Sequence, residues 1–198
     1  MNVIAHLVRV SVAIALSCAA GLSPANAAVI RFGAELAPEA LGATGSGSVL
    51  VAYDDAANTL QINADWTGLS GVTTVAHIHC CTAAPGAGTI GVAVTPGTLP
   101  GFPVGVSSGS YSSALIDLDD PASFTAAFRT NFGGGTTSGS IAALLAGIDA
   151  GTAYFNVHSN AFPGGEIRGF LREVPEPATL ALLGLGLTGL CLARRRRA

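Results

Sequence analysis

The sequence predicts a mainly β protein, an antiparallel β-sandwich with one or two short helices, flanked by a signal peptide and a C-terminal hydrophobic helix. Three observations lead to this prediction. Short segments rich in β-branched and aromatic residues alternate between apolar and polar positions, as half-buried strands do. Turn-forming residues separate these segments at short intervals, which is typical of sandwiches and barrels. Apolar runs stand at both ends of the chain.

The N-terminal end has the pattern of a secretory signal peptide. Arg9 precedes the apolar run Val10 to Leu22, and Ala25-Asn26-Ala27 offers the small residues that a signal peptidase requires. We therefore expect cleavage after Ala27. A lipoprotein signal at Cys18 is the alternative, but Ala15 stands where a lipobox has leucine.

Seven segments between the two ends have the alternation and composition of strands. Asp54-Asp55, Gly68 to Gly71 and Pro163-Gly164-Gly165 supply turn signals between them. The predicted strands are Val29 to Leu36, Ser48 to Tyr53, Thr59 to Trp66, Val72 to His79, Tyr111 to Leu118, Ala153 to His158 and Glu166 to Leu171.

Two segments favour helix instead. Pro121-Ala122-Ser123 introduces a helix over Phe124 to Phe132, and Ser138 to Ile148 is rich in alanine and leucine, with Gly151 beyond its end. Thr82 to Gly109 is rich in glycine and proline, and we expect a long loop or an irregular hairpin there.

Length and charge favour one exported domain. Between Ala28 and Val174, eleven acidic residues face four arginines, for a net charge of −7, and the chain contains no lysine. Such a surface disfavours nucleic acid and anionic lipid as partners. The sequence divides into a signal peptide (1–27), one domain (28–173) and a C-terminal sorting or anchor segment (174–198).

The C-terminal segment combines a proline motif, an uncharged run and a basic end. The uncharged run Ala178 to Ala193 would span about 24 Å as a helix, less than the roughly 30 Å of a hydrocarbon core. The positive-inside rule keeps the basic end in the cytoplasm. A plain short membrane anchor is one interpretation. The motif residues are Pro175, Glu176 and Pro177, and the basic residues are Arg194, Arg195, Arg196 and Arg197.

This order of features resembles the PEP-CTERM sorting signal. The resemblance implies export through the secretion machinery, a transient anchor in the inner membrane and processing by an exosortase-type enzyme in a Gram-negative bacterium. It also implies release to the cell surface or an extracellular matrix, where exopolysaccharide or other surface proteins are the expected partners.

Histidines are the main candidates for chemistry in the domain. Residues two apart on a strand point to the same face, so His77 and His79 are neighbours, and His158 joins them if its strand is adjacent. Three imidazoles can bind copper or zinc, with water, Glu166 or a cysteine sulfur as a further ligand. Alternatively, the three rings are structural and hydrogen-bond to backbone groups or carboxylates beneath the long loop.

Cys80 and Cys81 follow the His-Ile-His strand directly. The exported environment permits disulfides, so the two sulfurs can form a vicinal disulfide. Their Cα atoms are about 3.8 Å apart across a trans peptide, below the usual range, so such a ring would be strained. Metal ligation by a thiolate and free or intermolecular thiols are the alternatives.

The remaining motifs carry weaker chemical signals. Glu166 and Arg168 share a strand face and form either a catalytic pair or a salt bridge or loop tether. Gly133-Gly134-Gly135 lacks the lysine of a phosphate-binding loop. No pattern of a serine, zinc or paired-carboxylate hydrolase is present, which disfavours hydrolase chemistry and leaves redox chemistry at a metal as the enzymatic alternative.

The domain resembles the CHRD domain, first described in chordin and widespread in bacterial secreted proteins. Ala76-His77-Ile78-His79, Phe155 to Ser159 and Gly164 to Gly169 carry the resemblance, which covers nearly all of Val29 to Leu171. It implies a binding or scaffold module. We therefore expect an exported binding or structural protein, with a single-site copper or zinc protein as the alternative.

A β-sandwich with His-x-His on one strand and a third histidine on another is also similar to copper-zinc superoxide dismutase, where such a trio binds copper. That family needs a bridging histidine and a complete zinc shell. The mature domain has no histidine beyond His77, His79 and His158 to supply them, which argues against dismutase activity.

Overall fold

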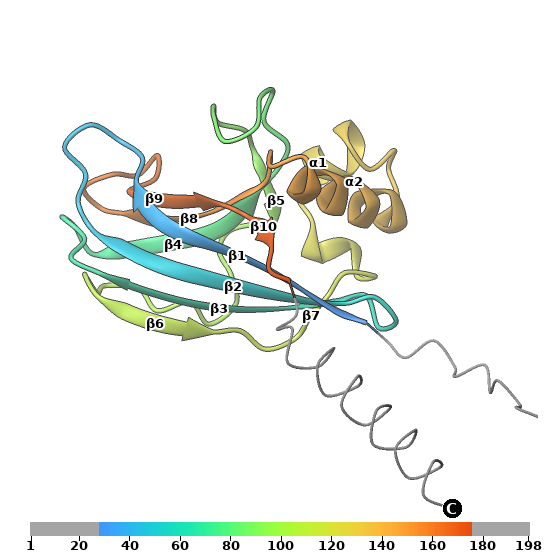
Figure 1. The fold of residues 1–198 in the computed structure, drawn as a ribbon, viewed down its shortest axis with the longest axis horizontal. Helices are drawn as coiled ribbons and strands as arrows, with labels where there is room; N and C mark the ends of the chain where they lie inside the picture. Colours follow the sequence, from blue (N-terminus) through green and yellow to red (C-terminus); the bar gives the residue numbers. More distant parts are fainter. Residues whose placement is uncertain (1–27, 176–198) are drawn as a thin grey trace, which may run out of the picture.

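The computed structural model describes residues 28–175, and the predicted signal peptide (1–27) and the C-terminal residues 176–198 lie outside the described part. Its strands form a curled, antiparallel sheet with two short α-helices at one end, which confirms the predicted fold class. The sheet folds over into two facing layers (Figure 1).

The first layer is built on three long strands, β1 (Val29–Pro38), β2 (Ser46–Asp54) and β3 (Thr59–Thr67). β2 and β3 pair along their whole length, from Ser46 opposite Thr67 to Asp54 opposite Thr59. Shorter strands complete the layer: β6 (Gly109–Ser112) and β7 (Ile116–Asp117) pair with β3, and β10 (Arg172–Glu173) pairs with β1.

The second layer has the order β5, β4, β8, β9, formed by β5 (Val92–Val94), β4 (Thr73–His79), β8 (Tyr154–Ser159) and β9 (Ile167–Phe170). β1 joins the two layers, because most of it pairs with β2 while Ala37 and Pro38 pair with β9. β4 and β8 lie side by side in the middle of this layer.

The helices cover the end of the sandwich at the right of Figure 1. A 3₁₀ turn (Pro121–Ser123) precedes α1 (Ala126–Asn131) and α2 (Thr137–Asp149). The N-cap side chains of α1 and α2, Thr125 and Thr136, each accept a hydrogen bond from a backbone N–H of the first turn. Within residues 28–175, neither helix has the length and apolar character needed to cross a membrane.

Most predicted elements are present, but three predictions need correction. The predicted strand Tyr111 to Leu118 is interrupted, because the Ser113 side chain accepts the N–H of Ile62 at 2.9 Å. The loop Thr82 to Gly109 contains β5, whose three residues are too few to show a period of two. The helix predicted over Phe124 to Phe132 is shorter, because Thr125 caps it.

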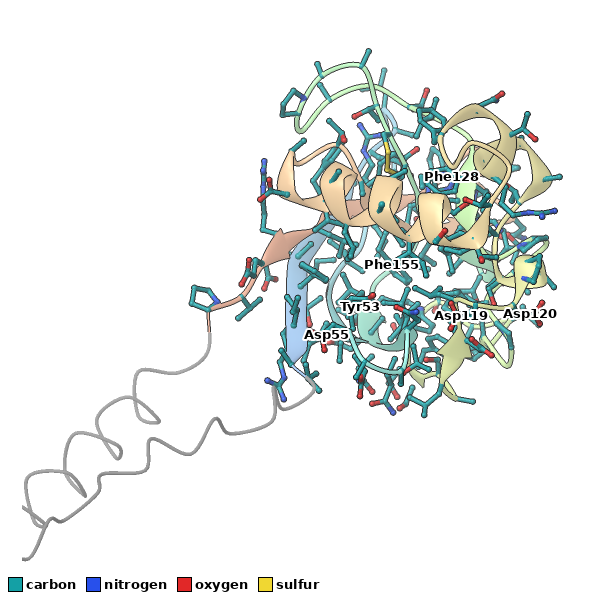
Figure 2. The ribbon with its side chains drawn as sticks, turned by 90° about the vertical axis from the view of Figure 1, so that its right-hand side faces the viewer. Tyr53, Asp55, Asp119, Asp120, Phe128 and Phe155 are labelled. Carbon is teal, nitrogen blue, oxygen red and sulfur yellow. A yellow bond between two sulfur atoms is a disulfide. The ribbon has the colours of Figure 1, made fainter. Side chains whose placement is uncertain are left out.

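The core lies between the two layers and beneath the helices. On β3 every second side chain is buried, which places Leu60, Ile62, Ala64 and Trp66 on the inner face. β8 contributes Phe155 and α1 contributes Phe128, both labelled in Figure 2. The alternation found in the sequence therefore separates core from surface on the first layer.

Tyr53 lies at an acidic end of the first layer, near Asp55 and Asp119 (Figure 2). Its hydroxyl donates to Asn58 Oδ1 at 2.8 Å, and Asn58 Nδ2 donates to the Asp119 carboxylate. Burial, followed by the negative charges of Asp55, Asp119 and Asp54, raises the pKa of Tyr53. This end shows how the domain's net negative charge gathers locally on its surface.

Glu166 ties the loop between β3 and β4 to the start of β9. Its side chain is fully buried, and its Oε1 accepts the backbone N–H of Ser70. Burial raises the pKa of Glu166, but hydrogen bonds from Ser159, Ser70 and Gly71 outweigh it, so the net shift is downward. A carboxyl with a lowered pKa stabilises the folded state only while it is ionised.

We expect Glu166→Gln to lower stability at neutral pH, with a smaller effect in acid. The contribution of Glu166 is present above its unfolded pKa of about 4.3 and is lost as pH falls through the lower folded value. Urea unfolding of both proteins between pH 3 and pH 7 measures this, with the exposed Glu35→Gln as control. A stability difference that is the same across this range would contradict the assignment.

Candidate metal centre

β4 and β8 bring the three predicted histidines together. His77 and His79 project from alternate positions of β4, and His158 projects from β8. One nitrogen from each ring lies within 4.8 Å of the other two, and His77 Nδ1 is 3.3 Å from His158 Nε2. Within residues 28–175, these three histidines form the group of possible ligand side chains (His, Cys, Asp or Glu) that lie close enough together to hold a metal ion.

The trio lies on the face of the second layer that points away from the core. Ile78, Phe155 and Val157 occupy the core face, so the residues between them face outward. His77, His79 and His158 are nevertheless only 6%, 7% and 8% exposed. The chain after β4 and the turn after β8 cover them.

Each ring is anchored by a backbone carbonyl of this covering chain. His77 Nε2 lies 2.8 Å from the carbonyl oxygen of Gly97, and His79 Nδ1 lies 2.7 Å from that of Ile90. His158 Nδ1 lies 2.8 Å from the carbonyl oxygen of Pro163. A carbonyl can only accept, so in each ring the nitrogen that faces it carries the hydrogen.

These anchors determine the tautomers of the neutral rings. Their other nitrogens, His77 Nδ1, His79 Nε2 and His158 Nε2, then carry lone pairs and no hydrogen. His77 Nδ1 and His158 Nε2 lie 3.3 Å apart and form a hydrogen bond only if one of the two nitrogens carries a hydrogen, and His79 Nε2 is buried without a hydrogen-bond partner in the described part of the chain. The arrangement has the form of a metal-ligating shell, in which each imidazole donates its remote N–H to a fixed acceptor.

The surroundings keep the His77 and His79 rings in the neutral form that binds metal. Burial lowers the pKa of His77 below its ordinary value, and the nearby His158 lowers it further. Burial lowers the pKa of His79 to about 4, although its hydrogen bond to Ile90 and the Asn156 side chain act in the opposite direction. At neutral pH, His77 and His79 are therefore neutral.

Polar side chains that were not predicted from the sequence surround the three histidines. The Tyr154 ring stacks on the His79 ring, with centroids 4.7 Å apart and an angle of 2° between the planes. Arg168, on the next strand β9, holds its guanidinium carbon 5.0 Å from the centroid of the Tyr154 ring. Asn156 donates to Glu39 Oε1 at 2.7 Å. One signal was available, because Tyr154, Asn156 and His158 alternate along one strand and therefore share its outward face.

Comparison with protein families confirms the two resemblances found in the sequence. Residues 20–171 match the model of the CHRD domain. The chain belongs to the CHRD-domain family. Residues 173–197 match the PEP-CTERM protein-sorting motif, which marks an exported protein with a C-terminal membrane anchor that exosortase processes. Comparison with curated proteins and with solved structures gave no match.

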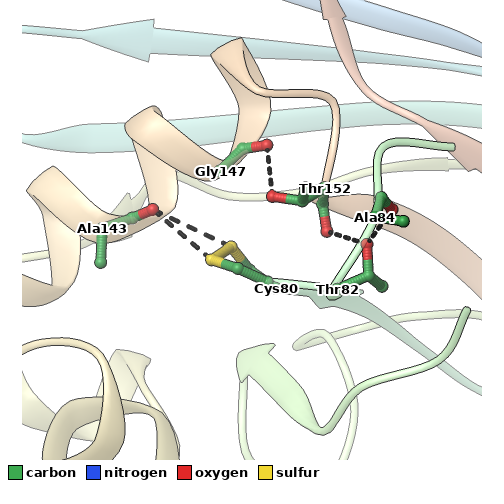
Figure 3. The surroundings of a disulfide bond; sticks show 7 residues. Cys80, Thr82, Ala84, Ala143, Gly147 and Thr152 are labelled. Atoms are coloured by element: carbon green, nitrogen blue, oxygen red, sulfur yellow. Dashed lines mark hydrogen bonds between the residues drawn. A yellow bond between two sulfur atoms is a disulfide. The ribbon is translucent and has the colours of Figure 1, made fainter. Parts of the chain in front are cut away.

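In this chain, a disulfide joins Cys80 and Cys81 directly after the His-Ile-His strand. Figure 3 shows the two sulfurs against α2, where they lie 3.9 and 3.6 Å from the carbonyl oxygen of Ala143. A Cβ atom at Gly147 would collide with both sulfurs, so this glycine allows the close approach. The sulfurs therefore contact the helix and do not belong to the histidine group.

The other candidates for a further ligand or a catalytic pair are placed elsewhere. Glu166 lies just before β9, and its carboxylate accepts from Ser70, so it is not part of the histidine group. Arg168 forms its ion pair with Glu39, at 3.3 Å, and donates to the carbonyl oxygen of Gly88 at 2.7 Å. The structure thus gives Glu166 and Arg168 separate tethering contacts.

We expect the Cys80 and Cys81 thiols to resist alkylation until a reductant is added, because a disulfide has no thiol to react. The measurement is intact mass after alkylation of the exported protein, before and after reduction, in a Cys191→Ser variant that removes the other cysteine of the mature chain. We expect no label before reduction and two labels after it. A Cys80→Ser, Cys81→Ser double variant is the control, and labelling without reduction would exclude the disulfide.

Proposed function

We propose that this CHRD domain is an exported metal-binding module in which His77, His79 and His158 hold one copper or zinc ion. The observation that carries this proposal is the convergence of three imidazole nitrogens whose opposite N–H groups are all committed to backbone carbonyls. When His77 and His158 both have the neutral tautomer that these carbonyls favour, no hydrogen lies between His77 Nδ1 and His158 Nε2. A cation between these nitrogens supplies the missing attraction.

The separations support a single ion. Two nitrogens bound tetrahedrally at about 2.0 to 2.1 Å from one ion are roughly 3.3 Å apart. His77 Nδ1 and His158 Nε2 already have this spacing. The trio as a whole extends to 4.8 Å, more than the roughly 4.1 Å that two such ligands can span, so a small inward rotation of a ring accompanies binding.

The ligand chemistry favours copper or zinc. Neutral imidazoles suit both ions, and three of them leave a fourth position for water or another small ligand. The Cys80 and Cys81 sulfurs are bonded to each other, so the ligands that the protein supplies are all nitrogen atoms. We assign the domain a metal-capturing role and propose no reaction for it.

Export determines where this module works. We propose that the signal peptide is removed after Ala27, that the anchor is transient and that the mature domain is released to the cell surface or the extracellular matrix. The sorting motif and the predicted signal peptide support this route. Exopolysaccharide and other surface proteins are the proposed neighbours there.

We expect near-stoichiometric copper or zinc in the exported full-length chain, purified in detergent without a polyhistidine tag and incubated with each metal. Elemental analysis and isothermal titration calorimetry measure it. His79→Ala removes one of three ligands, and since loss of even an outer partner costs about tenfold or more in metal affinity, we expect a larger loss here.

Thr74→Ala is the matched control, because Thr74 lies on β4 but is exposed. It should bind metal as the natural protein does. A folded protein that binds neither ion would contradict the proposal and leave the histidines a structural role. Equal binding by His79→Ala and the natural chain would place the metal elsewhere.

We expect a host with an exosortase to produce mature protein that lacks Arg194 to Arg197, and a host without the enzyme to retain them. Glu176→Gln changes the centre of the Pro175-Glu176-Pro177 motif and should block processing. Glu173→Gln, three residues earlier, is the control. Mass spectrometry of the surface fraction measures the C-terminus, and an intact basic end in the exosortase host would disprove the processing.

A further inference from the structure

Asn156 occupies the centre of the outward face that carries the histidines. It is the cross-strand partner of His77 on β4 and of Arg168 on β9, so the three residues form one row across the layer. His158 follows two positions later on β8 and shares this face. Directly opposite side chains in antiparallel strands have Cβ atoms about 5 Å apart, which places the amide beside the His77 ring.

The orientation of the amide is set from the side opposite the histidines. Its Nδ2 donates to Glu39 Oε1 at 2.7 Å, and Glu39 Oε2 forms the ion pair with Arg168. A carboxylate offers acceptors only, so the nitrogen and not the oxygen of Asn156 must face Glu39. A Cβ at Gly165 would collide with both the carboxylate and the amide, and this glycine leaves the room they need.

Asn156 Oδ1 is therefore left without a hydrogen-bond donor among the described residues. The residue is 1% exposed, and its Oδ1 has no hydrogen-bond partner within the described residues. A hydrogen bond with the Asn156 side chain raises the pKa of His79, so the amide lies beside that ring. In the neutral ring both Asn156 Oδ1 and His79 Nε2 are acceptors, and neither satisfies the other. Burying an amide oxygen without a partner is unfavourable, so a donor at this position has a clear physical role.

We propose that Asn156 Oδ1 accepts a hydrogen bond from a water molecule on the metal ion, and that Asn156 is the positioning residue for the fourth ligand. This inference rests on the proposed metal site. Three imidazoles leave one tetrahedral position open, and a metal-bound water is a strong donor. Glu39 and Arg168 hold the acceptor in place from behind, as outer residues do around metal sites.

Copper(II) and azide test this role separately from metal binding. Azide displaces a bound water but has no hydrogen to donate to Asn156, so the acceptor favours water over azide. In Asn156→Ala we expect copper affinity to fall by about the tenfold that loss of an outer partner costs, well short of the loss in His79→Ala. We expect the azide affinity of the copper-loaded protein to rise about two- to tenfold, the equivalent of one hydrogen bond. Calorimetry gives the copper affinity, and the azide-to-copper absorption band gives the azide affinity.

Asn156→Leu, which has a similar shape but no polar atom, is the second variant and should behave in the same way. Asn63→Ala, an exposed asparagine on β3, is the control and should match the natural chain in both affinities. Circular dichroism identifies the variants that fold, and the proposal is judged on a folded one.

The alternative outcomes separate the two proposals. Unchanged azide affinity in a folded Asn156 variant would overturn the positioning role while the metal site stands. A loss of copper affinity as large as that of His79→Ala, with an altered copper hyperfine splitting, would make Asn156 a ligand and also overturn it. If the natural chain binds no copper, both the metal site and the role of Asn156 fail.

Discussion

Every side chain of β8 is buried, both those that face the core and those that face away from it. A strand in a two-layer fold normally leaves its outward face to water, and here that face carries Tyr154, Asn156 and His158. Buried polar groups must find partners or remain unfavourable. The chain that covers this face therefore has to supply acceptors, and Gly97, Ile90 and Pro163 supply them as backbone carbonyls.

The chain that covers the outward face of β8 also determines which ligands the histidine site can bind. Because the carbonyls take the remote N–H of each ring, the nitrogens that face one another are acceptors only. Because Glu39 takes the amide nitrogen of Asn156, the remaining amide oxygen is also an acceptor. The centre of the face thus contains acceptors without donors, and burial favours the neutral forms of His77 and His79. In the proposed site, a bound cation and its water would complete this arrangement with the charge and the donors that these side chains do not provide.

The local sequence pattern was sufficient to predict an element where that element depends on neighbouring residues in the chain. The period of two placed His77 and His79 on one face, and the same pattern located the long strands of the first layer. It missed β5, which exists only because Val92 and Val94 pair with β4, and the break at Ser113, which depends on Ile62. The cover of the histidines and the contact between Glu39 and Asn156 join residues far apart in the chain, so no local pattern indicates them.

A purely structural trio would be expected to look different. Histidines that serve only to fill space beneath a loop use both ring nitrogens or leave one in contact with water. Here His79 Nε2 and Asn156 Oδ1, from neighbouring strands, are both buried without partners in the part of the chain that the structure describes. Beside them, His77 Nδ1 and His158 Nε2 lie 3.3 Å apart, and each of the three rings holds one nitrogen within 4.8 Å of the other two. In the proposed site, a single ion with one bound water would satisfy these groups together, which a set of unrelated structural contacts would not require.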